Sequence, residues 1–172
     1  CKDVELYTRI KMLANHGALT KHNHEIEGTN SRMNNFQAGI LSIKIDHLQS
    51  WTDQRRSIAD KYSELLKDVN QVEVPKIRIN SKHSFHLFVV KAERRDELFT
   101  YLKERNIQVL IHYPRILPNT KAYEYLKNDL TEFPVSLKNQ ELIISLPVFP
   151  EMRDDEINYV VNCIKFFYDK SK

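Results

Sequence analysis

The chain has 172 residues, of which 41% are hydrophobic and 28% are charged, and its formal net charge is +3 at pH 7. A chain of this length can bury one sizeable core, either as a single domain or as one domain plus part of another. The small net charge gives no argument for nucleic acid or a membrane surface as a partner. No apolar run approaches the roughly 18 residues that a membrane span needs. We therefore predict a soluble, globular protein with no nucleic-acid or membrane partner.

The chain uses cysteine sparingly. Cys1 and Cys163 lie at opposite ends of the sequence, without the spacing of a metal-binding or redox pair. This usage disfavours a disulfide framework and a zinc cluster, and it is typical of a reducing compartment, so we expect a cytoplasmic protein. The first residue is a cysteine rather than methionine, and a helical pattern begins almost at once. We therefore expect the chain to be a piece of a longer protein.

The N-terminal part of the sequence combines a short helical pattern with a polar loop. Leu6, Ile10 and Leu13 recur at i, i+4 and i+7, which predicts an amphipathic helix over residues 4–13. Apolar residues are scarce in residues 18–31. A loop of this composition cannot form a core by itself.

A longer helical pattern follows the polar loop. Apolar residues recur at mostly helical intervals over residues 36–65, which predicts two consecutive helices or one helix bent near residues 50–52. At about 1.5 Å per residue, an element of this length spans on the order of 45 Å, more than a small domain needs. We expect it to connect two bodies.

The sequence after residue 70 alternates between strand and helix patterns. Short runs rich in β-branched and aromatic residues predict strands, and longer runs with apolar residues at helical spacing predict helices. The predicted strands are residues 72–75, 77–79, 85–91, 107–111 and 142–145, and the predicted helices are residues 94–105, 122–126, 135–141 and 154–168. This order predicts an α+β body of about one hundred residues.

Hydrogen-bonding side chains gather in residues 28–38, immediately before the long helical pattern. Gly28 frees the backbone, Asn30 offers amide donors, and Arg32 offers a planar guanidinium suited to a carboxylate or phosphate. These groups predict an anion-binding site. The alternative is that Asn30 or Ser31 caps the helix and only satisfies its unpaired backbone N–H groups.

Five histidines raise the possibility of a metal site. His16, His22 and His24 cluster in the polar loop, whereas His83 and His86 flank the start of a predicted strand. No cysteine or carboxylate lies at zinc-like spacing from them, and the alternation of a strand would point His83 and His86 to opposite faces. We expect no metal site, and we expect the loop histidines to form hydrogen bonds or to line the cleft.

Aromatic residues alternate around His86 as they do in some RNA-binding sheets. Phe85 and Phe88 are the aromatic residues concerned. The glycines that accompany that pattern are missing, and the net charge is slight. We therefore expect both rings to belong to the core.

Several short motifs occur in a fixed order along the chain. They are residues 11–17, 27–33, 37–38, 41–44, 111–114 and 145–150. In order and separation they resemble the pyridoxal 5'-phosphate (PLP) dependent sugar aminotransferases of the DegT/DnrJ/EryC1/StrS family. The resemblance covers essentially the whole chain and implies the α/β fold of the C-terminal half of a fold-type I transferase.

The resemblance implies two parts within this chain. Residues 1–70 correspond to the tail of the large PLP-binding domain and the connecting helices, and residues 71–172 correspond to a small α+β domain with a mainly antiparallel sheet and flanking helices. The Schiff-base lysine of the family corresponds to a position upstream of this chain. We therefore expect no catalytic residue in this chain and no activity from the chain alone.

The resemblance also implies roles for four residues. Asn30 corresponds to an asparagine that reaches across a dimer interface to the cofactor phosphate of the neighbouring subunit. Arg32 corresponds to an arginine near the carboxylate of the amino donor. His112 and Tyr113 correspond to residues at the mouth of the active site, where they would contact the amino donor or the nucleotide sugar. Without the resemblance, the two residues would equally fit strand-end positions packed under Pro114.

The implied activity is transfer of an amino group, with glutamate as donor, to a nucleotide-linked keto sugar for a cell-surface glycan. The implied assembly is a homodimer with shared active sites. After Pro114 the sequence departs from the family pattern, and Arg115 and Lys121 either face a diphosphate or lie solvated on an exposed loop. The alternative to an enzyme is a stand-alone, non-catalytic α+β binding or regulatory module.

Overall fold

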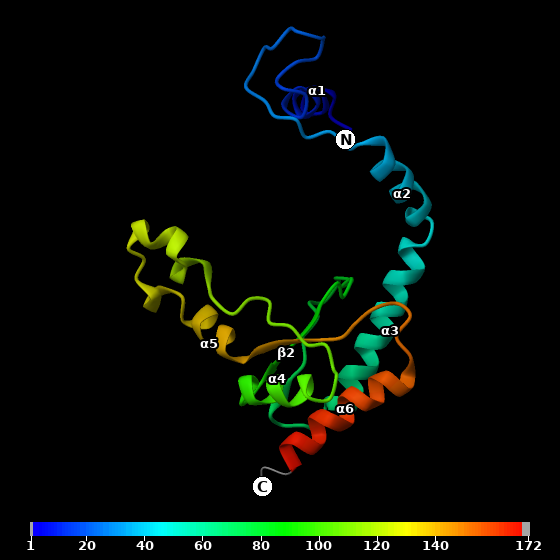
Figure 1. Cartoon of the computed structure of the whole chain (residues 1–172), viewed down its shortest axis with the longest axis vertical. Coiled ribbons are helices and arrows are strands. Elements are labelled where there is room, and N and C mark those ends of the chain that lie inside the picture. The colour runs from blue at the N-terminus through cyan, green and yellow to red at the C-terminus, as the bar shows by residue number, and fades with distance from the viewer. Residues whose placement is uncertain (1, 170–172) are drawn as a thin grey trace. The chain divides into compact units, whose positions relative to one another are not determined.

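The structure is a computed structural model, and it describes residues 2–169 of the chain. Contacts between residues divide the chain into two units, which are Cys1–Leu48 (unit 1) and Gln49–Lys172 (unit 2). Figure 1 shows the helices and strands of both units. Within the described residues, the named strands all belong to unit 2.

Unit 1 begins with helix α1 (Val4–Leu13), as predicted. The Asp3 side chain caps this helix by accepting a hydrogen bond from the backbone N–H of Leu6 at 3.0 Å. That bond satisfies one of the N–H groups that have no partner inside a helix. Leu6, Ile10 and Leu13 are 50%, 51% and 45% exposed, so the predicted apolar stripe is present and uncovered in this chain.

The polar segment after α1 folds back onto the C-terminal end of that helix. The backbone N–H of Thr29 donates to the Leu13 carbonyl at 2.8 Å, and the N–H of Ser31 donates to the Ala14 carbonyl at 3.0 Å. Carbonyl groups at the end of a helix have no partner within it, and these two bonds satisfy them. Asn30 lies between the two donors and is therefore held on the end of α1.

Two glycines make this close approach possible. Gly17 has a φ of 78°, in the left-handed region that glycine adopts without steric cost. A Cβ atom on Gly28 would lie 2.1 Å from the backbone nitrogen of Gly17. Gly28 is therefore required because there is no room for a side chain.

Helix α2 (Asn35–Ile45) and helix α3 (Leu48–Leu66) confirm the predicted pair of helices. The break lies at residues 46–47, and the prediction of a break near residues 50–52 is wrong. The Gln49 amide donates to both carboxylate oxygens of Asp53, at 3.0 and 2.9 Å. Such an i,i+4 contact supports a helix, so α3 continues through this region.

Unit 2 contains a sheet of three antiparallel strands in the order β1-β2-β3. The strands are β1 (Val72–Glu73), β2 (Phe88–Ala92) and β3 (Ile143–Leu146). In the central strand, Ala92 pairs with Val72 of β1, and Val90 pairs with Ile144 of β3. The predicted antiparallel sheet is confirmed.

Four predicted strands are shorter than expected or missing, and the first of them, predicted over residues 72–75, is reduced to Val72–Glu73. Residues 77–79 form no strand, and residues 107–111 contribute only an isolated bridge between Leu110 and Ser145. β2 begins later than predicted because Phe85 has a φ of 47°, which is incompatible with an extended strand. The sheet is therefore smaller than the sequence pattern suggests.

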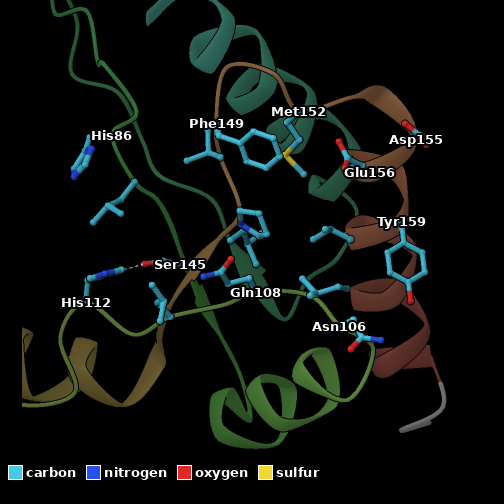
Figure 2. Close-up of a pocket in the computed structure, with 17 residues that line it drawn as sticks. His86, Asn106, Gln108, His112, Ser145, Phe149, Met152, Asp155, Glu156 and Tyr159 are labelled. Carbon is cyan, nitrogen blue, oxygen red and sulfur yellow. Dashed lines mark hydrogen bonds between the residues drawn. The ribbon is translucent and has the colours of Figure 1, made fainter. Parts of the chain in front are cut away.

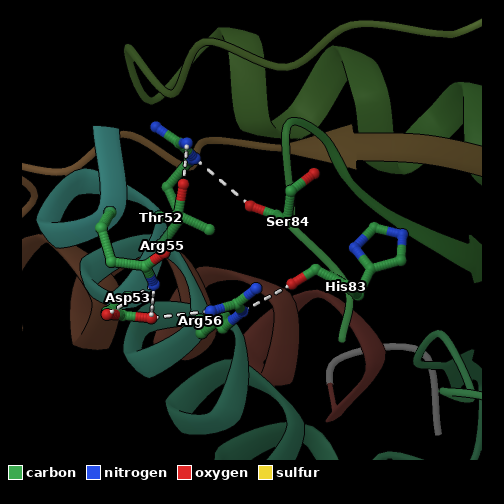
Figure 3. Close-up of polar contacts among 7 residues, drawn as sticks. Thr52, Asp53, Arg55, Arg56, His83 and Ser84 are labelled. Atoms are coloured by element: carbon green, nitrogen blue, oxygen red, sulfur yellow. Dashed lines mark hydrogen bonds and ion pairs between the residues drawn. The ribbon is translucent and has the colours of Figure 1, made fainter. Parts of the chain in front are cut away.

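Two arginines of α3 hold the segment that leads into β2 (Figure 3). Nε of Arg56 donates to the His83 carbonyl at 2.8 Å, and Nε of Arg55 donates to the Ser84 carbonyl at 3.3 Å. Arg56 also pairs with Asp53 at 2.7 Å. Guanidinium donors thus satisfy backbone carbonyls that a strand would have paired in a ladder.

The remaining helices of unit 2 include all four that were predicted. They are α4 (Arg95–Lys103), α5 (Pro134–Leu142) and α6 (Asp154–Asp169), together with the 3-10 helices η1 (Leu117–Asn119), η2 (Lys121–Leu126) and η3 (Leu130–Glu132). The helix predicted over residues 122–126 is therefore a 3-10 helix, and η1 and η3 are short 3-10 helices that the sequence pattern did not predict. Among residues 2–169, no helix combines the length and the apolar character needed to cross a membrane.

The core of unit 2 is built from the sheet and from α3, α4 and α6. Tyr62 of α3 and Phe88 of β2 are fully buried, and their rings stack with centroids 5.1 Å apart. The Tyr62 hydroxyl donates to the sulfur of Met152 at 3.8 Å, and burial raises the pKa of Tyr62. Phe85 is 3% exposed, which confirms that Phe85 and Phe88 belong to the core.

Candidate functional site

The predicted anion-binding residues of unit 1, Asn30 and Arg32, contact each other. Nε of Arg32 donates to the amide oxygen of Asn30 at 3.3 Å, and both side chains are exposed. Within residues 2–169, the amide NH₂ group of Asn30 and the terminal guanidinium nitrogens of Arg32 have no hydrogen-bond partner. The pair therefore presents several N–H donors without partners, which are the groups that bind a phosphate or carboxylate.

Helix α2 is capped by Asn34, and the interpretation of Asn30 or Ser31 as its cap is wrong. The Asn34 side chain accepts from the N–H of Gln37 at 2.8 Å, and the Gln37 side chain accepts from the N–H of Asn34 at 3.4 Å. These reciprocal bonds form a complete capping box. The Asn30 side chain is thus not needed by the helix.

His112 and Tyr113, the predicted substrate-binding residues of unit 2, follow the segment that bridges to β3. Nδ1 of His112 lies 2.8 Å from Oγ of Ser145. The Tyr113 ring meets the His112 ring edge-on, with centroids 5.4 Å apart, and the peptide bond between them is cis. Tyr113 is 72% exposed, so it does not pack as a buried strand-end residue.

A cavity of about 690 Å³ lies beside His112 in unit 2 (Figure 2). Apolar side chains, among them Leu146, Phe149 and Met152, form part of its lining. The polar side chains that line it are His86, Asn106, Gln108, His112, Ser145, Asp155, Glu156 and Tyr159. An apolar lining with a small number of polar groups is typical of sites that bind small molecules.

The polar groups of this cavity differ in character from one side to the other. In Figure 2, His86 and His112 lie on one side, and Asp155 and Tyr159 of α6 lie on the other. A hydrogen bond from Arg153 holds the pKa of Asp155 below its usual range. Tyr159 is 50% exposed, and its hydroxyl donates to the Arg105 carbonyl at 3.2 Å. The cavity therefore has imidazoles on one side and, on the other, a carboxylate that is paired with Arg153.

The four predicted site residues form two pairs, one in each unit: Asn30 with Arg32 and His112 with Tyr113. Sequence reasoning missed Ser145, which is 5% exposed and contacts His112. Ser145 lies in a strand that is otherwise apolar, and a buried polar group needs a hydrogen-bond partner. This pattern in the sequence could have indicated that Ser145 contacts another polar residue.

The other polar residues considered in the sequence analysis lie outside the two pairs described above. Nδ1 of His24 lies 2.7 Å from the His16 carbonyl, which confirms the expected hydrogen bonding of a loop histidine. In the part of the chain that the structure describes, no three His, Cys, Asp or Glu side chains are placed to hold a metal ion. Arg115 and Lys121 are exposed and do not line the cavity beside His112.

Comparison with known proteins identifies the family. The sequence profile of the DegT/DnrJ/EryC1/StrS aminotransferase family matches residues 1–165. The chain belongs to this family. The resemblance carried by the sequence motifs is confirmed.

This DegT/DnrJ/EryC1/StrS chain has curated relatives that share more than a third of the aligned residues with it. The dTDP-3-amino-3,6-dideoxy-alpha-D-galactopyranose transaminase of Aneurinibacillus thermoaerophilus is 37% identical over 162 residues, which are 94% of this chain and 44% of the relative. A protein of Geobacillus stearothermophilus named pleiotropic regulatory protein is 36% identical over 168 residues, which are 96% of this chain and 45% of the relative. The chain thus spans less than half the length of either relative.

Solved structures of the family have the same fold. S. venezuelae DesV, in complex with a ketimine intermediate, matches with a TM-score of 0.92 and 33% identity over 96% of this chain and 44% of that chain. A DegT/DnrJ/EryC1/StrS aminotransferase from Brucella abortus matches with a TM-score of 0.87 and 27% identity, again over 96% of this chain and 44% of that chain. The predicted α/β fold of a C-terminal part of such an enzyme is confirmed.

Proposed function

We propose that this chain is the C-terminal part of a PLP-dependent aminotransferase that transfers an amino group from glutamate to a nucleotide-linked keto sugar in cell-surface glycan biosynthesis. The observation that carries the proposal is the contact between Asn30 and Arg32, which presents N–H donors beside the backbone that Thr29 and Ser31 hold on the end of α1. Family membership supports the reaction class. Relatives named as dTDP-sugar and UDP-sugar aminotransferases support the substrate class.

The donor groups of Asn30 and Arg32 fit the two anions that such an enzyme must bind. The Asn30 amide suits the cofactor phosphate, and the planar guanidinium of Arg32 suits the carboxylate of the amino donor, to which it can make two parallel bonds. When bound, PLP supplies the electron sink that amino transfer needs. We assign no lysine of this chain to the covalent attachment of PLP, so the chain alone is expected to be inactive.

His112 and Tyr113 are assigned to contact with the nucleotide sugar or the amino donor. His112 lines a cavity whose volume of about 690 Å³ lies within the usual range of small-molecule sites. Tyr113 is 72% exposed and offers a hydroxyl that can donate and accept. Both side chains suit a polar ligand such as a sugar.

The proposed assembly is a homodimer with shared active sites in the cytoplasm. Helix α2 has no buried side chain, and Phe36 and Ile43 are 79% and 71% exposed. A second copy of the protein would cover this apolar surface, as in an isologous dimer. We assign residues 1–70 to the tail of the large domain and its connecting helices, and residues 71–172 to the small domain. The free thiol of Cys163 fits a reducing compartment.

The test uses the complete protein that contains this chain, with PLP, glutamate and a set of nucleotide-linked keto sugars. We expect glutamate to change the cofactor absorbance and a keto-sugar nucleotide to reverse that change, with 2-oxoglutarate and an aminated sugar as products. An absorbance change with another amino acid only would contradict glutamate as donor. Failure of the complete protein to bind PLP would favour the non-catalytic module, a role suggested by the name of the Geobacillus stearothermophilus relative, pleiotropic regulatory protein.

A further inference from the structure

Ser145 lies beside the cavity in a position that its backbone contacts hold on both sides. In β3 it pairs with Val89 of the central strand. On its other side, the Ser145 N–H donates to the Leu110 carbonyl at 2.8 Å, and the Leu110 N–H donates to the Ser145 carbonyl at 3.3 Å. The side chain is 5% exposed. Because the backbone is held on both edges, the Ser145 hydroxyl has a fixed place in the fold.

The Ser145 hydroxyl points at His112 (Figure 2). Oγ of Ser145 lies 2.8 Å from Nδ1 of His112, the diagonal neighbour beyond the Leu110–Ser145 bridge. A hydroxyl can both donate and accept, whereas a carbonyl or carboxylate can only accept. Serine therefore keeps its bond to Nδ1 in either neutral tautomer of His112 and in the charged imidazolium.

The second ring nitrogen of His112 is left for a ligand. Within residues 2–169, Nε2 of His112 has no hydrogen-bond partner. The bond to Ser145 and the edge-on contact with the Tyr113 ring hold the imidazole in place. A ring fixed through Nδ1 presents Nε2 in one direction. In functional histidines, the hydrogen bond made by one ring nitrogen commonly orients the other nitrogen toward the ligand.

We propose that Ser145 is a positioning residue that acts through His112: its buried hydroxyl fixes the imidazole so that Nε2 contacts the nucleotide sugar. The proposal deepens the function proposed above and rests on it for the identity of the ligand. A purely structural role for Ser145, in which the hydroxyl only satisfies its own burial, is the competing explanation.

The kinetic test compares Ser145→Ala with Ile144→Val in the complete enzyme. Ile144 is the fully buried neighbour in the same strand and does not line the cavity, so Ile144→Val perturbs the core without touching His112. We expect Ser145→Ala to raise KM for the nucleotide sugar about 3- to 10-fold, the usual effect of one lost hydrogen bond, with a smaller change in kcat. Ile144→Val should leave KM unchanged.

A double-mutant cycle shows whether Ser145 acts through His112. In a His112→Ala background, Ser145→Ala should have no further effect on KM, because the ring that it orients is gone. Equal effects of Ser145→Ala in both backgrounds would overturn the proposal and leave a structural role.

A spectroscopic test does not depend on the sugar being correctly identified. In protein labelled with ¹⁵N at histidine, the His112 ring signals are assigned by their loss in His112→Ala. Ser145→Ala should move the Nδ1 signal of His112, and Ile144→Val should not. An unchanged Nδ1 signal would overturn the proposal, whereas a shifted signal in an enzyme that aminates no sugar would refute only the proposed function.

Ser145→Cys keeps the test decisive if the alanine variant does not fold. A thiol fills the site but is a weak donor and acceptor. We expect a smaller displacement of the His112 Nδ1 signal and a smaller rise in KM than complete loss of the hydroxyl would give. A Ser145→Cys enzyme with wild-type Nδ1 signal and wild-type KM would contradict the proposal.

Discussion

The two units of this chain are stabilised in different ways. Unit 2 has a continuous core, in which residues such as Tyr62, Phe88 and Leu98 are fully buried. In the described part of unit 1, only two hydrophobic side chains are buried, Met12 and Ala18. Unit 1 is instead ordered by backbone hydrogen bonds and close glycine contacts. We expect a unit that leaves its apolar side chains uncovered to be completed by other parts of the protein, and this unit carries Asn30 and Arg32, which we propose to contact the cofactor and the amino donor.

Matched phenylalanine truncations give the largest expected difference between the units. Phe88 of unit 2 is 0% exposed, whereas Phe36 of unit 1 is 79% exposed. In the complete protein we expect Phe88→Ala to lower the free energy of unfolding by about 3–5 kcal/mol, since it opens a cavity in a packed core. Urea denaturation measures this loss.

Phe36→Ala is expected to act on assembly and not on the fold. Its effect on the unfolding of the monomer should stay within about 0.5 kcal/mol, as for most surface substitutions. Sedimentation should show a weaker dimer. If the dimer is unchanged, the proposal that a second copy covers α2 is wrong.

The next largest effects are expected at the Asn30–Arg32 pair. Removing a hydrogen bond to a charged group costs about 1.5–3 kcal/mol. We therefore expect Asn30→Ala to weaken PLP retention tenfold or more, and Arg32→Ala to raise KM for the amino donor by a similar factor. Equilibrium dialysis of PLP and steady-state kinetics with varied glutamate measure the two effects.

Asn34 provides the matched control for Asn30. Asn34→Ala removes the side-chain cap of α2, which should cost about 1 kcal/mol of stability. PLP retention should not change. If Asn34→Ala and Asn30→Ala weakened PLP binding equally, the effect would reflect the order of the loop and not a contact from Asn30 to the phosphate.

Replacing two glycines of unit 1 by alanine is expected to change the stability of the protein in opposite directions. A Cβ on Gly28 would clash with the backbone of Gly17, so Gly28→Ala should lower stability by about 1–3 kcal/mol. A Cβ on Gly39 of α2 meets nothing within 4 Å, and Gly39→Ala should raise stability by about 0.5–1 kcal/mol. Thermal denaturation of the complete protein gives both signs. A destabilising Gly39→Ala would show that the α2 backbone is not open in the assembled protein.

The sequence predicts the helices of this chain better than its strands. Periodicity locates α1 and α6 because their apolar faces are regular over several turns. The strand patterns mislead where long-range contacts decide the backbone. Phe85 looks like part of a strand but adopts a positive φ, and the preceding carbonyls bind arginines of α3 instead of a neighbouring strand.

The candidate site is predicted in part for a related reason. Asn30 and Arg32 are close in sequence, so their donor chemistry and their mutual contact can be read locally. The bond between His112 and Ser145 joins residues far apart in the chain and depends on the Leu110–Ser145 bridge. No local pattern reveals such a pairing, although a serine among buried strand residues signals that a partner exists.

The smallest expected effect is the change in the stability of unit 2 with pH. The Thr131 hydroxyl and N–H donate to Asp129 at 2.7 and 2.9 Å and lower the pKa of its carboxyl group. Because the folded pKa is lowered, this carboxylate stabilises the fold above its unfolded pKa of about 4, and the contribution is lost as pH falls through the folded pKa. Urea denaturation should therefore show Asp129→Asn to be slightly less stable than wild type at pH 7 and equal to it at about pH 2. Thr131→Ala removes the hydroxyl bond, which lowers the pKa of Asp129 more than the N–H bond does. In a Thr131→Ala protein, Asp129→Asn should therefore change the free energy of unfolding at pH 7 by less than it does in the wild type. A gap that persists undiminished in strong acid would mean that Asp129 stabilises the turn through its shape and not through its charge.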